Sequence, residues 1–128
     1  MLIADDEAHI RAVMAGIVRA LGGEVVAEAG DGEEAVQLFE RTHPDVVILD
    51  INMPRLTGDQ ALGRMLKSDP HVLGVMMTAQ DSITAVRDCL DLGARNYILK
   101  SNRAEEILRL LGAVWPEYTA EVSARMAQ

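Results

Sequence analysis

Carboxylates, a hydroxyl and an ammonium group stand at the ends of the apolar runs of this sequence. Asp5 and Asp6 follow the first run, Asp50 the third, Thr78 the fourth and Lys100 the fifth. Carboxylates gathered in one place repel one another, and a hard divalent cation with oxygen ligands relieves that repulsion. The sequence has no Cys/His cluster with zinc spacing, so magnesium is the cation that we expect.

The same groups are suited to phosphoryl transfer. A carboxylate can attack phosphorus and form an aspartyl phosphate, and such a transfer depends mainly on positioning and charge neutralisation. The set supplies an attacking aspartate, a cation, Lys100 for phosphoryl oxygens and the Thr78 hydroxyl as a donor. Each residue alone has an ordinary interpretation, such as an acidic helix start at Asp5 and Asp6. The hypothesis therefore depends on the whole set.

Strand-like and helix-like stretches alternate along the chain, and this order predicts the elements that position those groups. The hydrophobic spacing predicts five strands and five helices. Ser82 and Gly93 are the expected caps of the fourth helix. We expect strands over 2–4, 24–29, 45–50, 72–77 and 95–100, and helices over 10–21, 33–41, 59–68 and 82–92 and from about Asn102.

Five β-α units with apolar strands predict an α/β fold, in which helices cover both faces of a parallel sheet. Right-handed crossovers make this a doubly wound open sheet. Such sheets bind ligands at the carboxyl ends of their strands. The acidic residues, Thr78 and Lys100 should therefore meet at one edge of the sheet.

Composition narrows the class of protein. The chain has 128 residues, 49% of them apolar and 25% charged, which fits one globular domain. The net charge of −8 argues against direct binding of nucleic acid or of anionic membranes. No apolar run is long enough to span a bilayer, and the N-terminus does not resemble a signal peptide. The lone cysteine, Cys89, excludes an internal disulfide and favours a cytoplasmic protein.

With these residues in place, the sequence resembles the CheY-like receiver domain of two-component response regulators over about residues 2 to 112. The match depends on an ordered set of residues that is highly specific as a whole. Its members are Asp5-Asp6, Asp50 with Met53-Pro54 and Gly58, Thr78-Ala79, Gly93-Ala94 with Tyr97, and Lys100.

The resemblance implies a flavodoxin-like sheet in the order 2-1-3-4-5 and a role for each matching residue. Asp50 would be the phosphoacceptor. Asp5, Asp6, Asp50 and the Asn52 carbonyl would hold Mg²⁺, with Mn²⁺ as an alternative. Lys100 would pair with the phosphoryl group, and Thr78 and Tyr97 would switch together. Asn52 and Gln80 match positions that tune the lifetime of the phosphoryl group.

The function implied is a phosphorylation-controlled switch in partner binding, with no separate substrate. The phosphoryl group would come from a histidine kinase or a phosphotransfer protein, and a downstream output protein would read the switch. The chain as given is too short for an output domain of its own. An aspartyl-phosphate phosphatase would need a second acid where Asn52 stands. A flavin-binding protein is also excluded, because Asp5 and Asp6 would repel the flavin phosphate.

Two departures from the family pattern keep an alternative open. Ser101 follows Lys100 where the family usually has proline, often after a cis bond, and a non-proline residue favours the trans form. The first strand is also short for a central strand. The alternative is a receiver-like module that binds its partner without phosphorylation.

The C-terminal segment is less regular than the rest. We expect a receiver domain over 1–114 and a helical extension or frayed tail over 115–128. Pro116 interrupts a helical pattern there and either breaks the helix or opens a new one. The segment either packs back on the domain or forms a partner or homodimer surface, with Trp115 and Tyr118 as anchors.

Overall fold

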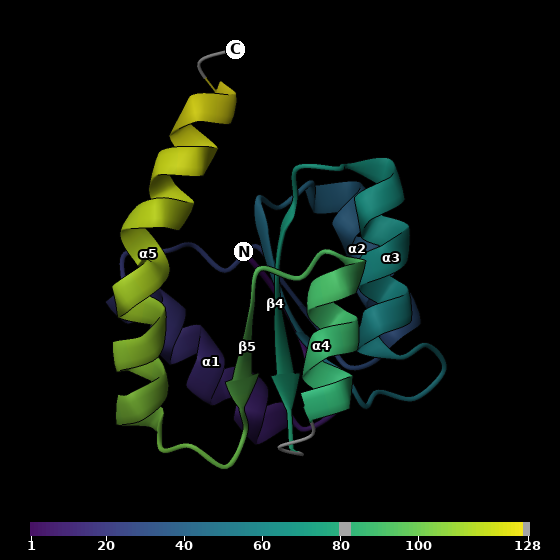
Figure 1. Ribbon diagram of the computed structural model, residues 1–128, viewed down its shortest axis with the longest axis horizontal. Coiled ribbons are helices and arrows are strands. Elements are labelled where there is room, and N and C mark those ends of the chain that lie inside the picture. The colour runs from purple at the N-terminus through teal and green to yellow at the C-terminus, as the bar shows by residue number, and fades with distance from the viewer. Residues whose placement is uncertain (80–82, 127–128) are drawn as a thin grey trace.

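A computed structural model describes residues 1–79 and 83–126 and shows a parallel sheet between two layers of helices (Figure 1). The sheet has five strands in the order β2-β1-β3-β4-β5, which confirms the predicted doubly wound topology. Ser82 and Gln80 lie outside the described residues. The elements are β1 Leu2–Ala4, α1 Ala8–Ala20, β2 Ala27–Ala29, α2 Gly32–Thr42, β3 Val46–Asp50, α3 Gly58–Ser68, β4 Leu73–Thr78, α4 Ile83–Leu92, β5 Asn96–Leu99 and α5 Ala104–Met126.

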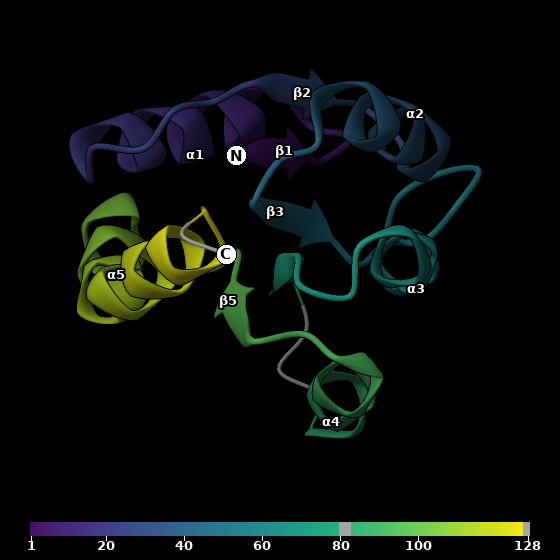
Figure 2. The ribbon, with the colours of Figure 1, turned by 90° about the horizontal axis from the view of Figure 1, so that it is seen from above.

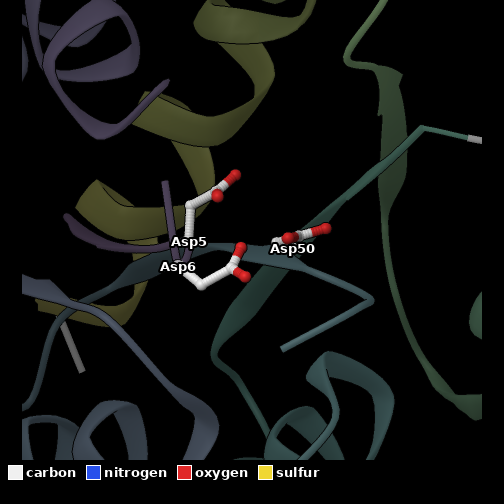
Figure 3. A group of neighbouring side chains, drawn as sticks. All are labelled: Asp5, Asp6 and Asp50. Atoms are coloured by element: carbon white, nitrogen blue, oxygen red, sulfur yellow. The ribbon is translucent and has the colours of Figure 1, made fainter. Parts of the chain in front are cut away.

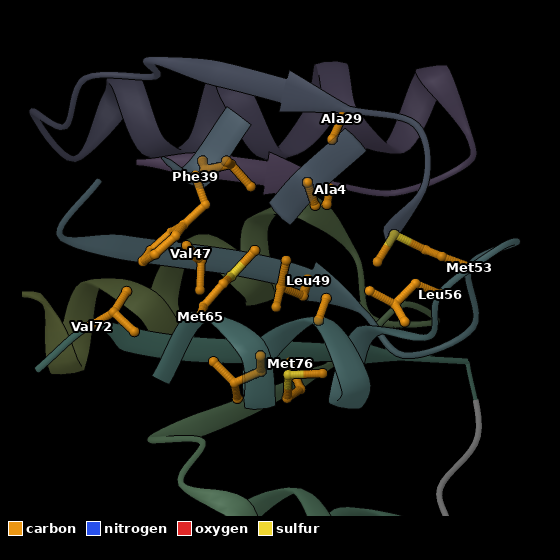
Figure 4. Packing of buried hydrophobic residues seen from close by; sticks show 14 of the residues in the cluster. Ala4, Ala29, Phe39, Val47, Leu49, Met53, Leu56, Met65, Val72 and Met76 are labelled. Atoms are coloured by element: carbon orange, nitrogen blue, oxygen red, sulfur yellow. The ribbon is translucent and has the colours of Figure 1, made fainter. Parts of the chain in front are cut away.

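Helices cover both faces of the sheet, with α1 and α5 on one side and α2, α3 and α4 on the other (Figure 2). β3 is buried along its whole length because successive side chains enter opposite layers. Val47 and Leu49 pack with Phe39 and Met65 on the α2/α3 side (Figure 4). Val46 and Ile48 pack on the α1/α5 side with the cluster that contains Met14, Ile17, Val18, Ile107 and Leu111. Cys89 is also buried, among the α2/α3 cluster.

The second strand is shorter than predicted, and its start at residue 24 was wrong. β1 pairs with β2 only from Leu2 to Ala4, opposite Ala27 to Ala29. The Val26 N–H still donates to the Met1 carbonyl at 2.9 Å, and the Met1 amine donates to the Glu24 carbonyl, but β1 itself begins only at Leu2. The length of the short central strand therefore limits its neighbour.

The last helix runs without a break from Ala104 to Met126, with Pro116 inside it. An interior proline removes one backbone hydrogen bond and costs about 3 kcal/mol. Trp115 and Tyr118, on either side of Pro116, both pack on the α1/α5 cluster, and this burial offsets that cost. A Cβ on Gly23 would come within 2.9 Å of the Trp115 ring, which shows how closely the indole lies against that turn.

Of the two predicted alternatives for this segment, the structure shows the one in which it packs back on the domain. Tyr118 is buried, and its hydroxyl accepts a hydrogen bond from Asn96 Nδ2 at 3.1 Å. Further along the helix, Glu121 pairs with Arg95 at 2.6 Å, and Arg125 Nη2 pairs with Asp69 Oδ2 at 2.9 Å. The segment packs back across the amino-terminal edge of the sheet. No helix in the described part of the chain is long and apolar enough to cross a membrane.

Candidate functional site

The predicted site residues meet at the carboxyl edge of the sheet. Asp50 ends β3 and pairs in register with Met77, and Thr78 ends β4 opposite Leu99. Asp5 follows β1 directly, and its N–H donates to the Ala29 carbonyl at 3.0 Å. Parallel pairing therefore brings the ends of neighbouring strands to one level, as the sequence predicted.

Asp5, Asp6 and Asp50 form one carboxylate group at this edge (Figure 3). One oxygen from each side chain lies within 4.8 Å of the others. Asp5 is fully buried and Asp50 is 3% exposed, whereas Asp6 faces solvent. Backbone N–H groups orient the two buried carboxylates, since Glu7 donates to Asp5 Oδ1 at 2.9 Å and Asn52 to Asp50 Oδ1 at 3.3 Å. Their Oδ2 atoms both lie next to Lys100 Nζ.

Lys100 places its ammonium between these acids. Its Nζ lies 2.9 Å from Asp5 Oδ2, 2.9 Å from Glu7 Oε2 and 3.2 Å from Asp50 Oδ2. The described backbone contains no cis peptide bond, so the bond from Lys100 to Ser101 is trans, as expected without proline. The Lys100 N–H donates to the Thr78 carbonyl at 2.8 Å, so β-type pairing with β4 holds this position. The trans bond thus leaves Lys100 at the site.

A divalent cation fits this group of oxygens. Asp5 Oδ2 has no access to solvent, and within the described residues it accepts no hydrogen bond of acceptable geometry, although Lys100 lies beside it. A buried anionic oxygen with incomplete hydrogen bonding is costly unless a cation coordinates it. Three carboxylates and no sulfur or imidazole ligand suit magnesium or manganese rather than zinc.

The charged groups at the site, together with their burial, shift one another's pKa values. Burial raises the pKa of Asp50, and the neighbouring Asp5 charge raises it further, against the opposing effect of Lys100. Burial by itself lowers the pKa of Lys100, but its contacts with Asp5 and Glu7 outweigh burial, so the net pKa is raised. Lys100 is therefore fully charged at neutral pH. The hydrogen bond from Lys100 also lowers the pKa of Glu7.

Without a divalent cation, we expect Asp50→Asn to raise the free energy of unfolding at pH 7 by about 0.5–2 kcal/mol. A carboxylate with a raised pKa binds more protons in the folded state than in the unfolded state, so it destabilises the fold where it is ionised. The gain should shrink as the pH falls through the folded-state pKa of Asp50. Urea titrations in EDTA at several pH values measure it.

The exposed Asp88→Asn on α4 is the matched control and should show no such pH-dependent gain. A loss of stability in Asp50→Asn at pH 7 would contradict the prediction, because it would mean that pairing with Lys100 outweighs burial and Asp5.

The loop after β3 holds Asp50 in place through close backbone packing. The Gly58 N–H donates to the Ile51 carbonyl at 2.9 Å, and a Cβ at Gly58 would lie 2.1 Å from the Asp50 carbonyl oxygen. Thr57 and Gln60 form a capping box that starts α3 at this point. Met53 is buried in the α2/α3 cluster. These contacts are the physical reason for the spacing from Asp50 to Gly58.

The remaining predicted residues surround this centre. Thr78 is buried at the end of β4. Tyr97 is 43% exposed on β5, and Ala79 and Asn52 face solvent. The ligand role of the Asn52 carbonyl and the switching of Tyr97 stay predictions.

Two contacts at the site were not foreseen. The Glu7 side chain contacts Lys100, and Arg11 Nη1 donates to the Asp5 carbonyl at 2.6 Å. The only signal for either was position, since Glu7 follows the acid pair and Arg11 lies one helical turn beyond it.

Comparison with known proteins agrees with this geometry. Residues 1–111 match the response regulator receiver domain. Chemotaxis protein CheY of Listeria monocytogenes is 37% identical over 111 residues, 87% of this chain and 93% of that protein. The transcriptional regulatory protein PdtaR of Mycobacterium tuberculosis is 42% identical over 100 residues, 78% of this chain and 48% of that protein.

Solved structures show the same likeness. The CheX-CheY-BeF3-Mg complex of Borrelia burgdorferi contains a chain with a TM-score of 0.82 and 31% identity, covering 89% of this chain and 87% of that one. The receiver domain of AraT from Geobacillus stearothermophilus has a TM-score of 0.83 and 30% identity, covering 98% and 95%. The fold and the acidic edge thus define a signalling domain of the α/β class. The chain belongs to the response regulator receiver family of two-component signalling and is CheY-like.

Proposed function

We propose that this protein is a phosphorylation-controlled receiver in which Asp50 accepts the phosphoryl group. The observation that carries the proposal is the position of Asp50, which belongs to a group of carboxylates that could hold a cation and has Lys100 Nζ 3.2 Å from its Oδ2. A nucleophile beside a lysine and a group of carboxylates suited to a divalent cation is what phosphoryl transfer requires. The presence of BeF3 and Mg in the similar CheX-CheY complex of Borrelia burgdorferi supports this assignment.

In the proposed step, a carboxylate oxygen of Asp50 attacks the phosphorus of the donor. The new bond joins that oxygen to phosphorus, the bond from phosphorus to the donor breaks, and its electron pair leaves with the donor. Asp5, Asp6 and Asp50 would hold a magnesium ion, which neutralises charge on the phosphoryl group during transfer. Lys100 binds a phosphoryl oxygen as transfer proceeds.

Phosphorylation replaces one carboxylate charge at Asp50 with about −2 and adds strong acceptors. Thr78 ends the neighbouring strand and offers a hydroxyl to those acceptors. Its movement and a change at Tyr97 would alter the surface of β5 and α4, which a partner then reads. A histidine kinase or phosphotransfer protein would supply the phosphoryl group, and the chain would act on no separate substrate.

The test is the intact mass of the protein after incubation with acetyl phosphate and magnesium, where acetate is the leaving group. We expect one adduct of about 80 Da on the wild type, and none without magnesium. Asp50→Asn should stay unmodified. Asp45→Asn, directly before the start of the same strand, should be modified like the wild type.

An equal adduct on Asp50→Asn would place the phosphoryl group on another residue and contradict the proposal. If acetyl phosphate and a phosphorylated histidine donor both fail with the wild type, a receiver-like module that binds without phosphorylation becomes the better account.

A further inference from the structure

The ammonium of Lys100 is already surrounded by oxygens before any phosphoryl group arrives. An ammonium has three N–H donors. Nζ donates to Glu7 Oε2 at 2.9 Å and to Asp50 Oδ2 at 3.2 Å, it lies 2.9 Å from Asp5 Oδ2, and the Lys100 side chain is only 11% exposed. A phosphoryl oxygen must therefore compete with these carboxylates for the Lys100 ammonium.

Glu7 differs from the other two carboxylates around Lys100. Asp5 and Asp50 are buried and belong to the group that fits a cation, whereas the Glu7 side chain is 49% exposed and lies outside that group. Glu7 is the N-cap residue of α1, yet its side chain makes no capping hydrogen bond. Its Oε2 instead accepts a hydrogen bond from Lys100 at 2.9 Å. Glu7 is thus the neighbour that can leave at the lowest cost.

The net charge at this edge of the sheet affects how an anionic donor approaches Lys100. Asp5, Asp6, Glu7 and Asp50 place four carboxylates around one ammonium, so a divalent cation leaves the edge with one negative charge. Arg11, which donates to the Asp5 carbonyl, is offset by Glu28 at 3.9 Å. An anionic donor therefore meets net repulsion, and Glu7 adds to it while occupying Lys100.

We propose that Glu7 is a positioning residue that competes with the incoming phosphoryl group for Lys100 and so limits how readily Asp50 is phosphorylated. This inference rests on the proposed function. Glu7 acts through Lys100 and does not itself touch the transferred group. Its removal should free the ammonium for the donor and leave the backbone N–H of Glu7, which orients Asp5, unchanged.

The test compares Glu7→Gln, Glu7→Asp and the wild type at saturating magnesium, so that changes in metal affinity do not enter. The first measurement is the second-order rate constant for the adduct with acetyl phosphate. The second is the dissociation constant of beryllofluoride, which needs no turnover of the donor. We expect Glu7→Gln to raise the rate constant and tighten beryllofluoride binding by about two- to fivefold, the range for an ion pair of this exposure.

Glu7→Asp keeps the charge but is one methylene shorter, so it should lose the contact with Lys100 and show most of the same gain. The control is Glu33→Gln, which removes an exposed carboxylate in the first turn of α2 and should match the wild type.

The inference would be overturned if Glu7→Gln formed the adduct no faster than the wild type. It would also be overturned if Glu7→Asp behaved like the wild type. A similar gain in Glu33→Gln would also overturn it, because the effect would then come from net charge alone. If no protein forms an adduct or binds beryllofluoride, the proposed function itself fails, and the inference fails with it.

Discussion

Replacing Lys100 with methionine should lower the free energy of unfolding by about 3–5 kcal/mol at pH 7 in the absence of divalent cations. The ammonium lies within 3.2 Å of Asp5 and Asp50, both almost completely buried. Methionine fills a similar volume without the charge, so the variant leaves two buried carboxylates facing each other. Urea denaturation in EDTA measures the loss.

Magnesium should restore much of this lost stability, because a cation that binds only the folded state stabilises it. Lower pH should restore it too, since the unpaired carboxylates then take up protons on folding. The chain has one other lysine, Lys67, which is exposed on α3, and Lys67→Met should change stability by less than about 0.5 kcal/mol. Equal stability of Lys100→Met and Lys67→Met in EDTA would refute the role of Lys100 as the central counter-charge.

Gly58→Ala should cost about 3 kcal/mol and also weaken magnesium binding. The added methyl group would lie 2.1 Å from the Asp50 carbonyl oxygen and 2.8 Å from its carbon, and both are backbone atoms that cannot rotate away. The loop must move to relieve this overlap, and that movement displaces the phosphoacceptor. Thermal unfolding and calorimetric titration with magnesium report the two effects.

Gly63 provides the matched control because it lies in the same helix. A Cβ there would meet only Leu92 at 3.9 Å, an ordinary contact. Gly63→Ala should therefore stabilise the protein by about 0.5–1 kcal/mol. If Gly58→Ala were as stable as Gly63→Ala and bound magnesium as the wild type does, the close packing behind Asp50 would not matter.

The core of the site was predictable from sequence because it depends on topology. In a parallel doubly wound sheet the carboxyl ends of neighbouring strands lie level, so residues that follow apolar runs must meet. Asp5, Asp50, Thr78 and Lys100 all follow such runs. To locate these residues, it was enough to know where each apolar run ends. An error of one or two residues in a strand boundary did not move them to another edge of the sheet.

The features that escaped prediction depend on packing between distant segments. Glu7 and Lys100 are 93 positions apart, and their contact depends on side-chain conformation rather than on periodicity. The helix continues through Pro116 because Tyr118 finds a buried place beside Asn96, which no local pattern reveals. The start of β2 was misplaced because it is set by the length of β1.

The packing of Trp115 against Gly23 also determines what the intrinsic fluorescence of this protein measures. Trp115 is the single tryptophan of the chain, and it lies at the amino-terminal edge of the sheet, away from Asp50. Its emission therefore follows the docking of the C-terminal half of α5 rather than the chemistry at the carboxylates. A fluorescence change upon addition of magnesium or a phosphodonor would mean that the rearrangement had crossed the whole sheet.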